Sequence, residues 1–238
     1  MEEFESAFAR IAGRFSRVEP RRRARAFLLG LLSDVDGRSC WQLAEQAGDA
    51  TPRGMQRLLG EARWDADAVR DDLRGYVVDE LGDPGAVLIL DDTGDLKKGS
   101  HTVGVQRQYT ATAGRIENAQ VAVFLAYASR HGHTLIDREM YLPCCWTDDA
   151  ARCAKAGVPA HVRFATKITL ARRMLARAVD TGVPAAWCTA DEFYGADRRL
   201  RRDLQARGLG YVMAVARSHR LTVCAAIGVQ RADQAATG

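Results

Sequence analysis

The run Ala86-Val87-Leu88-Ile89-Leu90 decides the fold, because it is continuously apolar and stops at Asp91-Asp92-Thr93-Gly94. Such a run predicts a strand buried on both faces of a sheet. A second apolar run, Ala185–Ala190, leads directly into Asp191. Ligands gather at the carboxyl ends of strands in sheets of this kind. If the two strands are neighbours, one of the first two aspartates lies beside Asp191.

The surrounding pattern predicts a mixed α/β sheet. Antiparallel strands come first and strand–helix–strand units follow, which is the order typical of such a sheet. The last dozen residues form no recognisable element. Further strands are predicted at 103–110, 119–128, 135–141 and 211–216, and helices at 148–156, 167–181 and 196–207.

Residues 1–85 are predicted to form a helical N-terminal region, with the sheet in residues 86–238. Two helices within residues 3–32 are expected to break near Glu19-Pro20. Ser39 can cap a helix through Gln46, and Thr51-Pro52 can open another one through Gly60 or Arg63. This pair fits either a DNA-binding helix-turn-helix or an ordinary helical hairpin. The turn at 82–85 marks the expected boundary between the two regions.

Charge and composition indicate a globular protein with a basic second part. Residues 1–85 hold 13 Lys and Arg against 16 Asp and Glu, whereas the remainder holds 21 against 14. A polyanion is therefore expected to bind mainly to the second part. The six cysteines have no paired spacing typical of a zinc ribbon or a disulfide framework. Without a signal peptide or a long apolar run, the chain is expected to be cytoplasmic.

Two adjacent carboxylates have a specific chemical use. They repel each other unless a cation or a proton lies between them. Mg²⁺ prefers such oxygen ligands together with substrate phosphates, and a pair of metal ions can promote phosphodiester cleavage. Each aspartate can also serve simply as a turn cap, because Asp-Asp-Thr-Gly is favourable turn chemistry.

Three other kinds of site are disfavoured. Asp92-Thr93-Gly94 resembles an aspartic protease motif, but such an enzyme needs two motifs that share a proton. The stretch 94–100 has its lysines before the second glycine, which is the wrong order for a phosphate-binding loop. His131-Gly132-His133 lies at a predicted turn with no third metal ligand beside it, so a solvated loop is expected there.

Several sequence blocks, in order along the chain, resemble the DDE transposases of bacterial insertion sequences, of the type named after IS701. The most specific block is 88–99, where Asp-Asp-Thr-Gly is followed by Lys-Lys-Gly. The likeness extends to about Arg220. The other blocks are Trp41–Glu45, Val105–Tyr109, Tyr141–Pro143 with Trp146–Asp149, Phe164–Lys167 and Ala190–Gly195.

This resemblance implies an RNase H-like core that cuts and rejoins DNA at transposon ends with Mg²⁺ or Mn²⁺. Carried over by position, Asp91 and Asp191 would be metal ligands, and Asp92 would be a helper or an alternative ligand. The partners of the chain would be DNA, further copies of the chain, or an intact transposase. The residues expected to contact phosphates are Lys97, Lys98, Arg107 and Lys167, for which a role in surface solubility is an equal alternative.

One expected element of the family is missing. The third carboxylate of the family, a glutamate on a late helix, has no match between Gly195 and Gly238. The chain is therefore expected to be a truncated copy with an incomplete core and little activity by itself, because catalysis is sensitive to geometry. The alternatives are a non-catalytic DNA-binding remnant that inhibits an intact transposase, and a chain too incomplete to fold stably.

Overall fold

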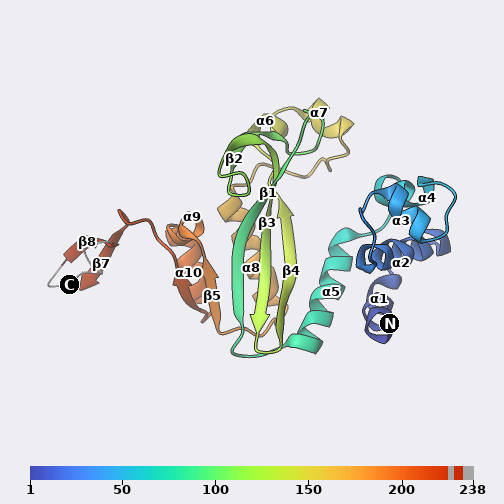
Figure 1. Ribbon diagram of the computed structural model, residues 1–238. Helices are drawn as coiled ribbons and strands as arrows, with labels where there is room; N and C mark the ends of the chain where they lie inside the picture. The colour runs from blue at the N-terminus through green and yellow to red at the C-terminus, as the bar shows by residue number, and fades with distance from the viewer. Residues whose placement is uncertain (225–227, 233–238) are drawn as a thin grey trace. The chain divides into compact units, whose positions relative to one another are not determined.

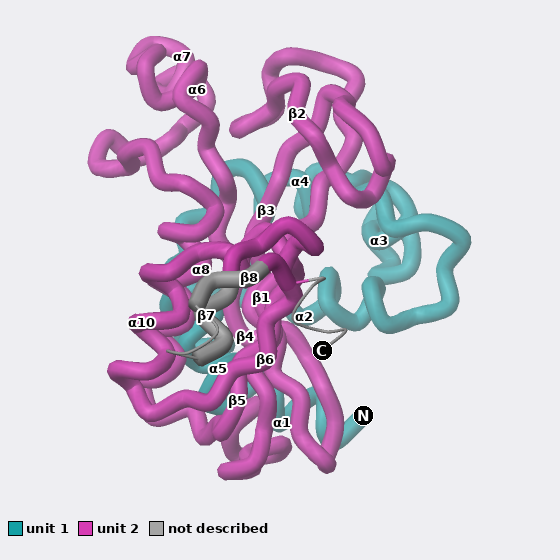
Figure 2. Tube along the Cα trace, turned by 90° about the vertical axis from the view of Figure 1, so that its left-hand side faces the viewer, with its two compact units in different colours: residues 1–76 teal, residues 77–238 magenta. Residues whose placement is uncertain are grey.

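The computed structural model describes residues 1–224 and 228–232. The chain forms two compact units, residues 1–76 and 77–238, which Figure 2 colours separately. The division falls within helix α5, Ala66–Leu81, and residues 82–85 form a turn in the second unit. Within the described residues, none of the helices combines the length and the apolar character that a membrane crossing requires.

The first unit is helical, as the sequence predicts. Its core contains Phe8, Ile11, Leu43, Met55 and Leu58 in two clusters. The predicted cap is confirmed, because Ser39 and Gln42 form a reciprocal capping box. Its helices are α1 (Glu2–Ala12), α2 (Val18–Leu32), α3 (Cys40–Gln46), α4 (Arg53–Gly60) and the first part of α5.

Two details of this unit differ from the sequence prediction. The break between the first helices lies at residues 13–17 and not at Glu19-Pro20, which form part of the first turn of α2. Proline is tolerated there because the first N–H groups of a helix have no intrahelical partner. The connection between α3 and α4 spans residues 47–52, longer than the usual turn of a helix-turn-helix. The helix-turn-helix assignment stays a prediction.

The second unit is built on a six-stranded mixed sheet (Figure 1). Its strands are β1 (Val87–Leu96), β2 (Gln106–Thr110), β3 (Arg115–Ser129), β4 (Gly132–Met140), β5 (Trp187–Ala190) and β6 (Gly210–Met213). Its remaining helices are α6 (Cys144–Thr147), α7 (Ala150–Lys155), α8 (Lys167–Asp180), α9 (Glu192–Gly195) and α10 (Arg198–Ala206). The strands β7 (Arg220–Cys224) and β8 (Gly228–Arg231) form a separate antiparallel hairpin.

The strand order identifies the sheet as RNase H-like. β1 is central, with β3 antiparallel on one side and β5 followed by β6 parallel on the other. β4 pairs with the edge of β3 that faces away from β1, which completes the order β4-β3-β1-β5-β6. β2 pairs with the first residues of β3. Helix α8 connects β4 to β5 and α10 connects β5 to β6. The predicted mixed α/β fold with a preceding helical region is confirmed.

The core of this unit lies between the sheet and its crossover helices. Leu88 and Leu90 of β1 are fully buried with Met174 of α8 and Leu200 of α10. In Figure 1, α8 lies against the central strands. Because strand side chains alternate between faces, Asp92 points toward the same face as Leu88 and Leu90, and Asp91 toward the opposite face.

Some smaller predictions are resolved by the structure. β1 does not end at Leu90 but continues to Leu96, because β3 pairs with its whole length. The expectation of no element in the last dozen residues is wrong, since β8 lies there; residues 233–238 are outside the described part. The histidines of 131–133 flank a hairpin turn at Gly132, where φ is +147°. The free cysteines are Cys40, Cys144, Cys145, Cys153 and Cys188, and Cys224 is outside the described side chains.

Candidate active site

The parallel pairing of β1 with β5 brings the predicted aspartates together. Its last register pair is Leu90 with Ala190, and Asp91 and Asp191 are the next residues of the two strands. Neighbouring strands lie about 4.8 Å apart, so the two backbones are adjacent at this point. Beyond it β1 pairs only with β3, and the sheet is open on the side of Asp191. The two carboxylates therefore lie where the sheet divides.

Asp91 is a carboxylate reached by solvent and yet partly desolvated. Its Oδ1 accepts a hydrogen bond of 2.7 Å from the backbone N–H of Asp92. Partial burial raises the pKa of Asp91, and the negative charges of Asp191 and Asp92 raise it further, while the Asp92 N–H and Lys167 act in the opposite direction. The site thus combines partial burial of Asp91 with two further negative charges near it.

Asp191 is held in place by the helix that follows it. Its Oδ1 accepts hydrogen bonds from the backbone N–H groups of Phe193 at 3.0 Å and Tyr194 at 3.2 Å, and so caps α9. Among the described residues, no donor is bonded to its Oδ2. One oxygen is therefore fixed and the other is available to a ligand.

Asp92 differs from the other two aspartates because both of its oxygens are occupied. Lys167 Nζ lies 3.0 Å from Oδ1, and the Tyr194 hydroxyl donates a 2.9 Å hydrogen bond to Oδ2. The Asp92 and Lys167 side chains are 17% and 18% exposed, so this ion pair is largely shielded from water. Burial, together with the charge of Asp92, raises the pKa of Tyr194, which keeps the hydroxyl protonated as a donor. The Asp92 side chain is thus largely buried and fully hydrogen-bonded, whereas the Asp91 side chain is exposed on the opposite face of β1.

Lys167 lies inside this cluster instead of on an open surface. It is the first residue of α8, which Thr166 caps through a 3.1 Å hydrogen bond from the Thr169 N–H. Its Nζ lies 5.9 Å from the ring centroid of Tyr141 and 5.7 Å from that of Phe193, distances typical of cation–π contacts. Neither aromatic residue, nor Tyr194, was a candidate in the sequence. Their positions inside the family-like sequence blocks 141–143 and 190–195 are the signal that could have indicated them.

The other predicted phosphate contacts lie apart from the carboxylates. Lys97 and Lys98 follow the end of β1, where Lys97 forms an ion pair with Asp95. Arg107 is exposed on β2. These three side chains are accessible from solvent to differing degrees, and their contact with DNA stays a prediction.

Comparison with known proteins gives the family of this chain. The family model described as DDE superfamily endonuclease matches residues 10–236. The chain belongs to the DDE endonuclease superfamily. It is also 26% identical over 197 residues to a probable transposase for insertion sequence element IS701 from Microchaete diplosiphon, a match covering 82% of the chain and 49% of that relative. The resemblance to IS701-type transposases is confirmed, and the chain spans about half the length of this curated relative.

Two solved structures show a more distant likeness to this superfamily member. A Mos1 transposase paired-end complex with the left transposon end is 18% identical, with a TM-score of 0.25, and covers 78% of this chain and 57% of that one. A pre-cleavage Mos1 transpososome is 15% identical, with a TM-score of 0.24 and coverages of 82% and 59%.

In this DDE superfamily member, the packing around Asp191 requires a glycine at position 195, the last residue of α9. A Cβ at this position would overlap the carbonyl oxygen of Ala214 and approach the Cβ of Met213 to 3.0 Å. Gly195→Ala is therefore expected to lower the free energy of unfolding by about 1 to 3 kcal/mol, as in other overpacked sites. Chemical denaturation measures this change. Gly99→Ala is the matched control, because its Cβ would meet no atom, and an equal loss in both variants would contradict the packing explanation.

Proposed function

We propose that this chain carries the catalytic carboxylates of an insertion-sequence transposase that cleaves and joins DNA phosphodiester bonds at transposon ends. The observation that carries the proposal is the adjacency of Asp91 and Asp191 at the point where β1 and β5 stop pairing. Burial first, and then the charges of Asp191 and Asp92, raise the pKa of Asp91, which supports the proposal because a partly buried carboxylate beside others favours a cation.

The donor set fits a hard divalent cation such as Mg²⁺ or Mn²⁺. Asp91 and Asp191 each have a carboxylate oxygen that is not bonded to another described residue. Mg²⁺ is commonly bound by one or two carboxylates together with water and substrate phosphates. Once bound, such an ion would supply activation of a water or hydroxyl nucleophile and stabilisation of the leaving oxygen.

The Asp91 side chain is held in position by a chain of contacts that begins at Lys167 and Tyr194 and passes through Asp92. Lys167 and Tyr194 fix both Asp92 oxygens, and the Asp92 N–H in turn fixes Oδ1 of Asp91. Asp92 is therefore assigned as a positioning residue, and Asp91 as the ligand from β1. The Lys167 ammonium also partly balances the charge of the three aspartates before substrate arrives.

Asp92, the third carboxylate of this cluster, has both oxygens occupied by Lys167 and Tyr194, so Asp91 and Asp191 are the two proposed ligands. No group of three His, Cys, Asp or Glu side chains is arranged there to hold a metal ion, within residues 1–224 and 228–232. Two carboxylates hold an ion less firmly than three, and the geometry of cleavage is sensitive to such a loss. We therefore expect the chain by itself to cleave DNA weakly.

DNA is the partner that the charge of the sheet region favours. The part of the chain after residue 85 carries an excess of seven basic residues, and polyanion binding follows such an excess. Lys97, Lys98 and Arg107 are the proposed backbone contacts outside the carboxylate cluster. Helices α3 and α4 are the proposed second DNA-contacting element, and self-association or assembly with a longer transposase is proposed for the complete reaction.

Two measurements on the purified chain test the function. The first is Mn²⁺ binding followed by electron paramagnetic resonance, with saturable binding expected. The second is nicking of supercoiled plasmid with and without Mg²⁺, with weak metal-dependent nicking expected. Absence of any specific Mn²⁺ binding would overturn the proposed site. Robust nicking that Asp191→Ala abolishes would overturn the expectation of weak cleavage and leave the site intact.

Asp92→Asn distinguishes the positioning role of Asp92 from a ligand role. The amide keeps one acceptor oxygen, so it can retain the hydrogen bond from Lys167 or from Tyr194 but not both, and the negative charge that balances Lys167 is lost. The Mn²⁺ affinity is expected to fall about tenfold, the lower end of the effect of residues that support metal ligands. A loss as large as that of Asp91→Asn would instead make Asp92 a ligand. Asp95→Asn, an exposed carboxylate on the same strand, is the control and should change the affinity little.

A further inference from the structure

A second polar site lies in the sheet unit, apart from the aspartates, beside Trp146. It is a cavity of about 210 Å³ between helix α7 and the loop that follows β1. In Figure 1 these segments lie at the end of the sheet marked by α6, α7 and β2. The lining residues are His101, Trp146, Arg152, Lys155 and Ala156, and an adjoining shallower hollow shares His101, Arg152 and Lys155.

Arg152 is held in a fixed orientation at this cavity. Its Cζ lies 3.6 Å from the ring centroid of Trp146, and its Nη2 donates a 2.8 Å hydrogen bond to the carbonyl of Ser100. Trp146 is itself buried and donates from Nε1 to the Val105 carbonyl at 2.9 Å. The guanidinium is therefore preorganised, and its remaining N–H donors form the planar fork that suits a phosphate.

The charges at the cavity also favour an anion. Within the described residues, neither Arg152 nor Lys155 forms an ion pair with a carboxylate. Asp149 lines the shallower hollow, but its Oδ1 is occupied by the Arg152 N–H at 2.8 Å, where it caps α7. Two cationic side chains thus face one capping carboxylate, and His101 adds a further polar group.

We propose that Arg152 and Lys155 bind a backbone phosphate of DNA at this cavity, an inference that rests on the proposed function. The cavity is close enough to the aspartates for one DNA duplex to contact both places. The part of β1 from Asp91 to Leu96 is about 17 Å long, and the loop bearing Ser100 and His101 follows directly. One turn of B-DNA, about 34 Å, is enough to span such a separation.

The salt dependence of DNA affinity tests this proposal. A protein that loses one phosphate contact loses about 0.9 from the slope of log affinity against log salt concentration. Lys155→Gln is expected to reduce the slope by about this amount in fluorescence anisotropy with a short labelled duplex. Arg152→Gln should do the same, and Arg152→Lys, which keeps the charge, should retain the wild-type slope. The matched control is Arg199→Gln, an exposed arginine on α10, which should also retain it.

The outcomes separate this inference from the proposed function. If the wild-type chain binds DNA and neither Lys155→Gln nor Arg152→Gln changes the slope, the cavity contact is overturned and the DNA-binding function stands. If the wild-type chain binds no DNA, both are overturned. Inorganic phosphate is titrated separately by calorimetry. Binding that Lys155→Gln removes, with an unchanged DNA slope, would assign the cavity to a free phosphate and overturn the DNA contact.

Because Lys155 is exposed and takes part in no described ion pair, its substitution is not expected to affect folding. Arg152→Gln also loses the contact with Trp146, so its effect on the slope is not that of the charge alone. The Lys155 variant therefore decides the result if the Arg152 variant is poorly folded.

Discussion

Asp91→Asn is expected to weaken Mn²⁺ binding by the purified chain more than about 100-fold. Substitution of residues that merely support metal ligands costs 10- to 100-fold in affinity, so the loss of a ligand should cost more. Asparagine keeps the shape of the side chain and can still accept the hydrogen bond from the Asp92 N–H. The variant therefore removes one negative charge with little effect on the backbone. Mn²⁺ titration followed by electron paramagnetic resonance measures the change.

A thermal measurement provides an independent check of this result. A ligand that binds the folded state raises the melting temperature. Mn²⁺ should therefore stabilise the wild-type chain and leave the melting temperature of Asp91→Asn nearly unchanged. Asp191→Asn should behave in the same way, because asparagine still caps α9. Equal stabilisation of the wild type and both variants by Mn²⁺ would show that the ion binds elsewhere.

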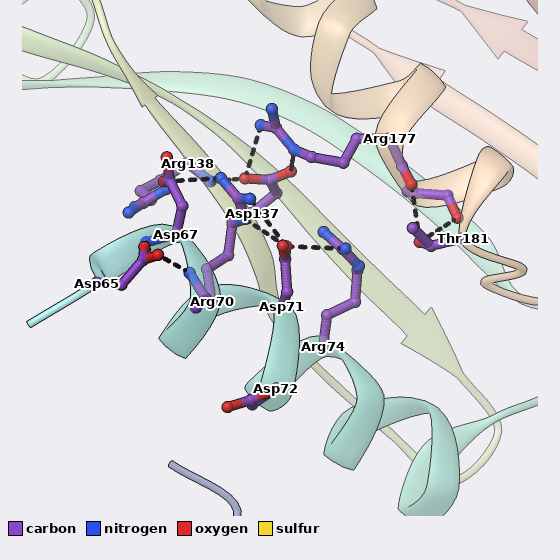
Figure 3. Close-up of polar contacts among 12 residues, drawn as sticks. Asp65, Asp67, Arg70, Asp71, Asp72, Arg74, Asp137, Arg138, Arg177 and Thr181 are labelled. Atoms are coloured by element: carbon purple, nitrogen blue, oxygen red, sulfur yellow. Dashed lines mark hydrogen bonds and ion pairs between the residues drawn. The ribbon is translucent and has the colours of Figure 1, made fainter. Parts of the chain in front are cut away.

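Arg177→Ala is expected to lower the free energy of unfolding of the sheet unit by about 3 to 5 kcal/mol. Arg177, on α8, donates to Asp137 on β4 at 2.8 and 3.1 Å (Figure 3). It also donates to Glu139 at 2.7 Å. The Asp137 side chain is fully buried, and loss of a partner from a buried ion pair typically costs this much. These carboxylates raise the pKa of Arg177, so the arginine stays charged at all ordinary pH values. Denaturant unfolding measures the loss.

Arg173→Ala is the matched control for this prediction. Arg173 lies on the same helix but is exposed, so its replacement should change stability by less than about 0.5 kcal/mol. A similar loss in the two variants would contradict the attribution of the effect to the ion pair, because alanine favours the helix more than arginine does. The ion pair of Arg177 with Asp137 also matters to the candidate active site. It attaches α8 to β4, and Lys167 is the first residue of α8.

Local patterns in the sequence predicted most of the fold. The apolar runs 86–90 and 185–190 predicted buried strands, and β1 and β5 form there. The Ser39 cap predicted the start of α3. Boundaries were less accurate where a partner strand decides them. β1 extends through Leu96 because β3 supplies its hydrogen bonds, although the polar sequence after Leu90 favours a turn.

The sequence by itself determined which residues can bear the chemistry. Two apolar runs that are each followed directly by aspartate, together with ordered blocks similar to IS701-type transposases, indicated Asp91, Asp92 and Asp191. Those features are local, since they depend on residue type and on spacing along the chain.

Only the tertiary structure decided how those residues differ from one another. The sequence left Asp92 open as a helper or an alternative ligand beside Asp91, and the alternation of the strand turns the two side chains toward opposite faces. The face of Asp92 meets Lys167 and Tyr194, 75 and 102 positions away, which occupy both of its oxygens. Asp91 keeps an available oxygen beside Asp191. Long-range contacts of this kind depend on sheet register and helix packing, which no local pattern specifies.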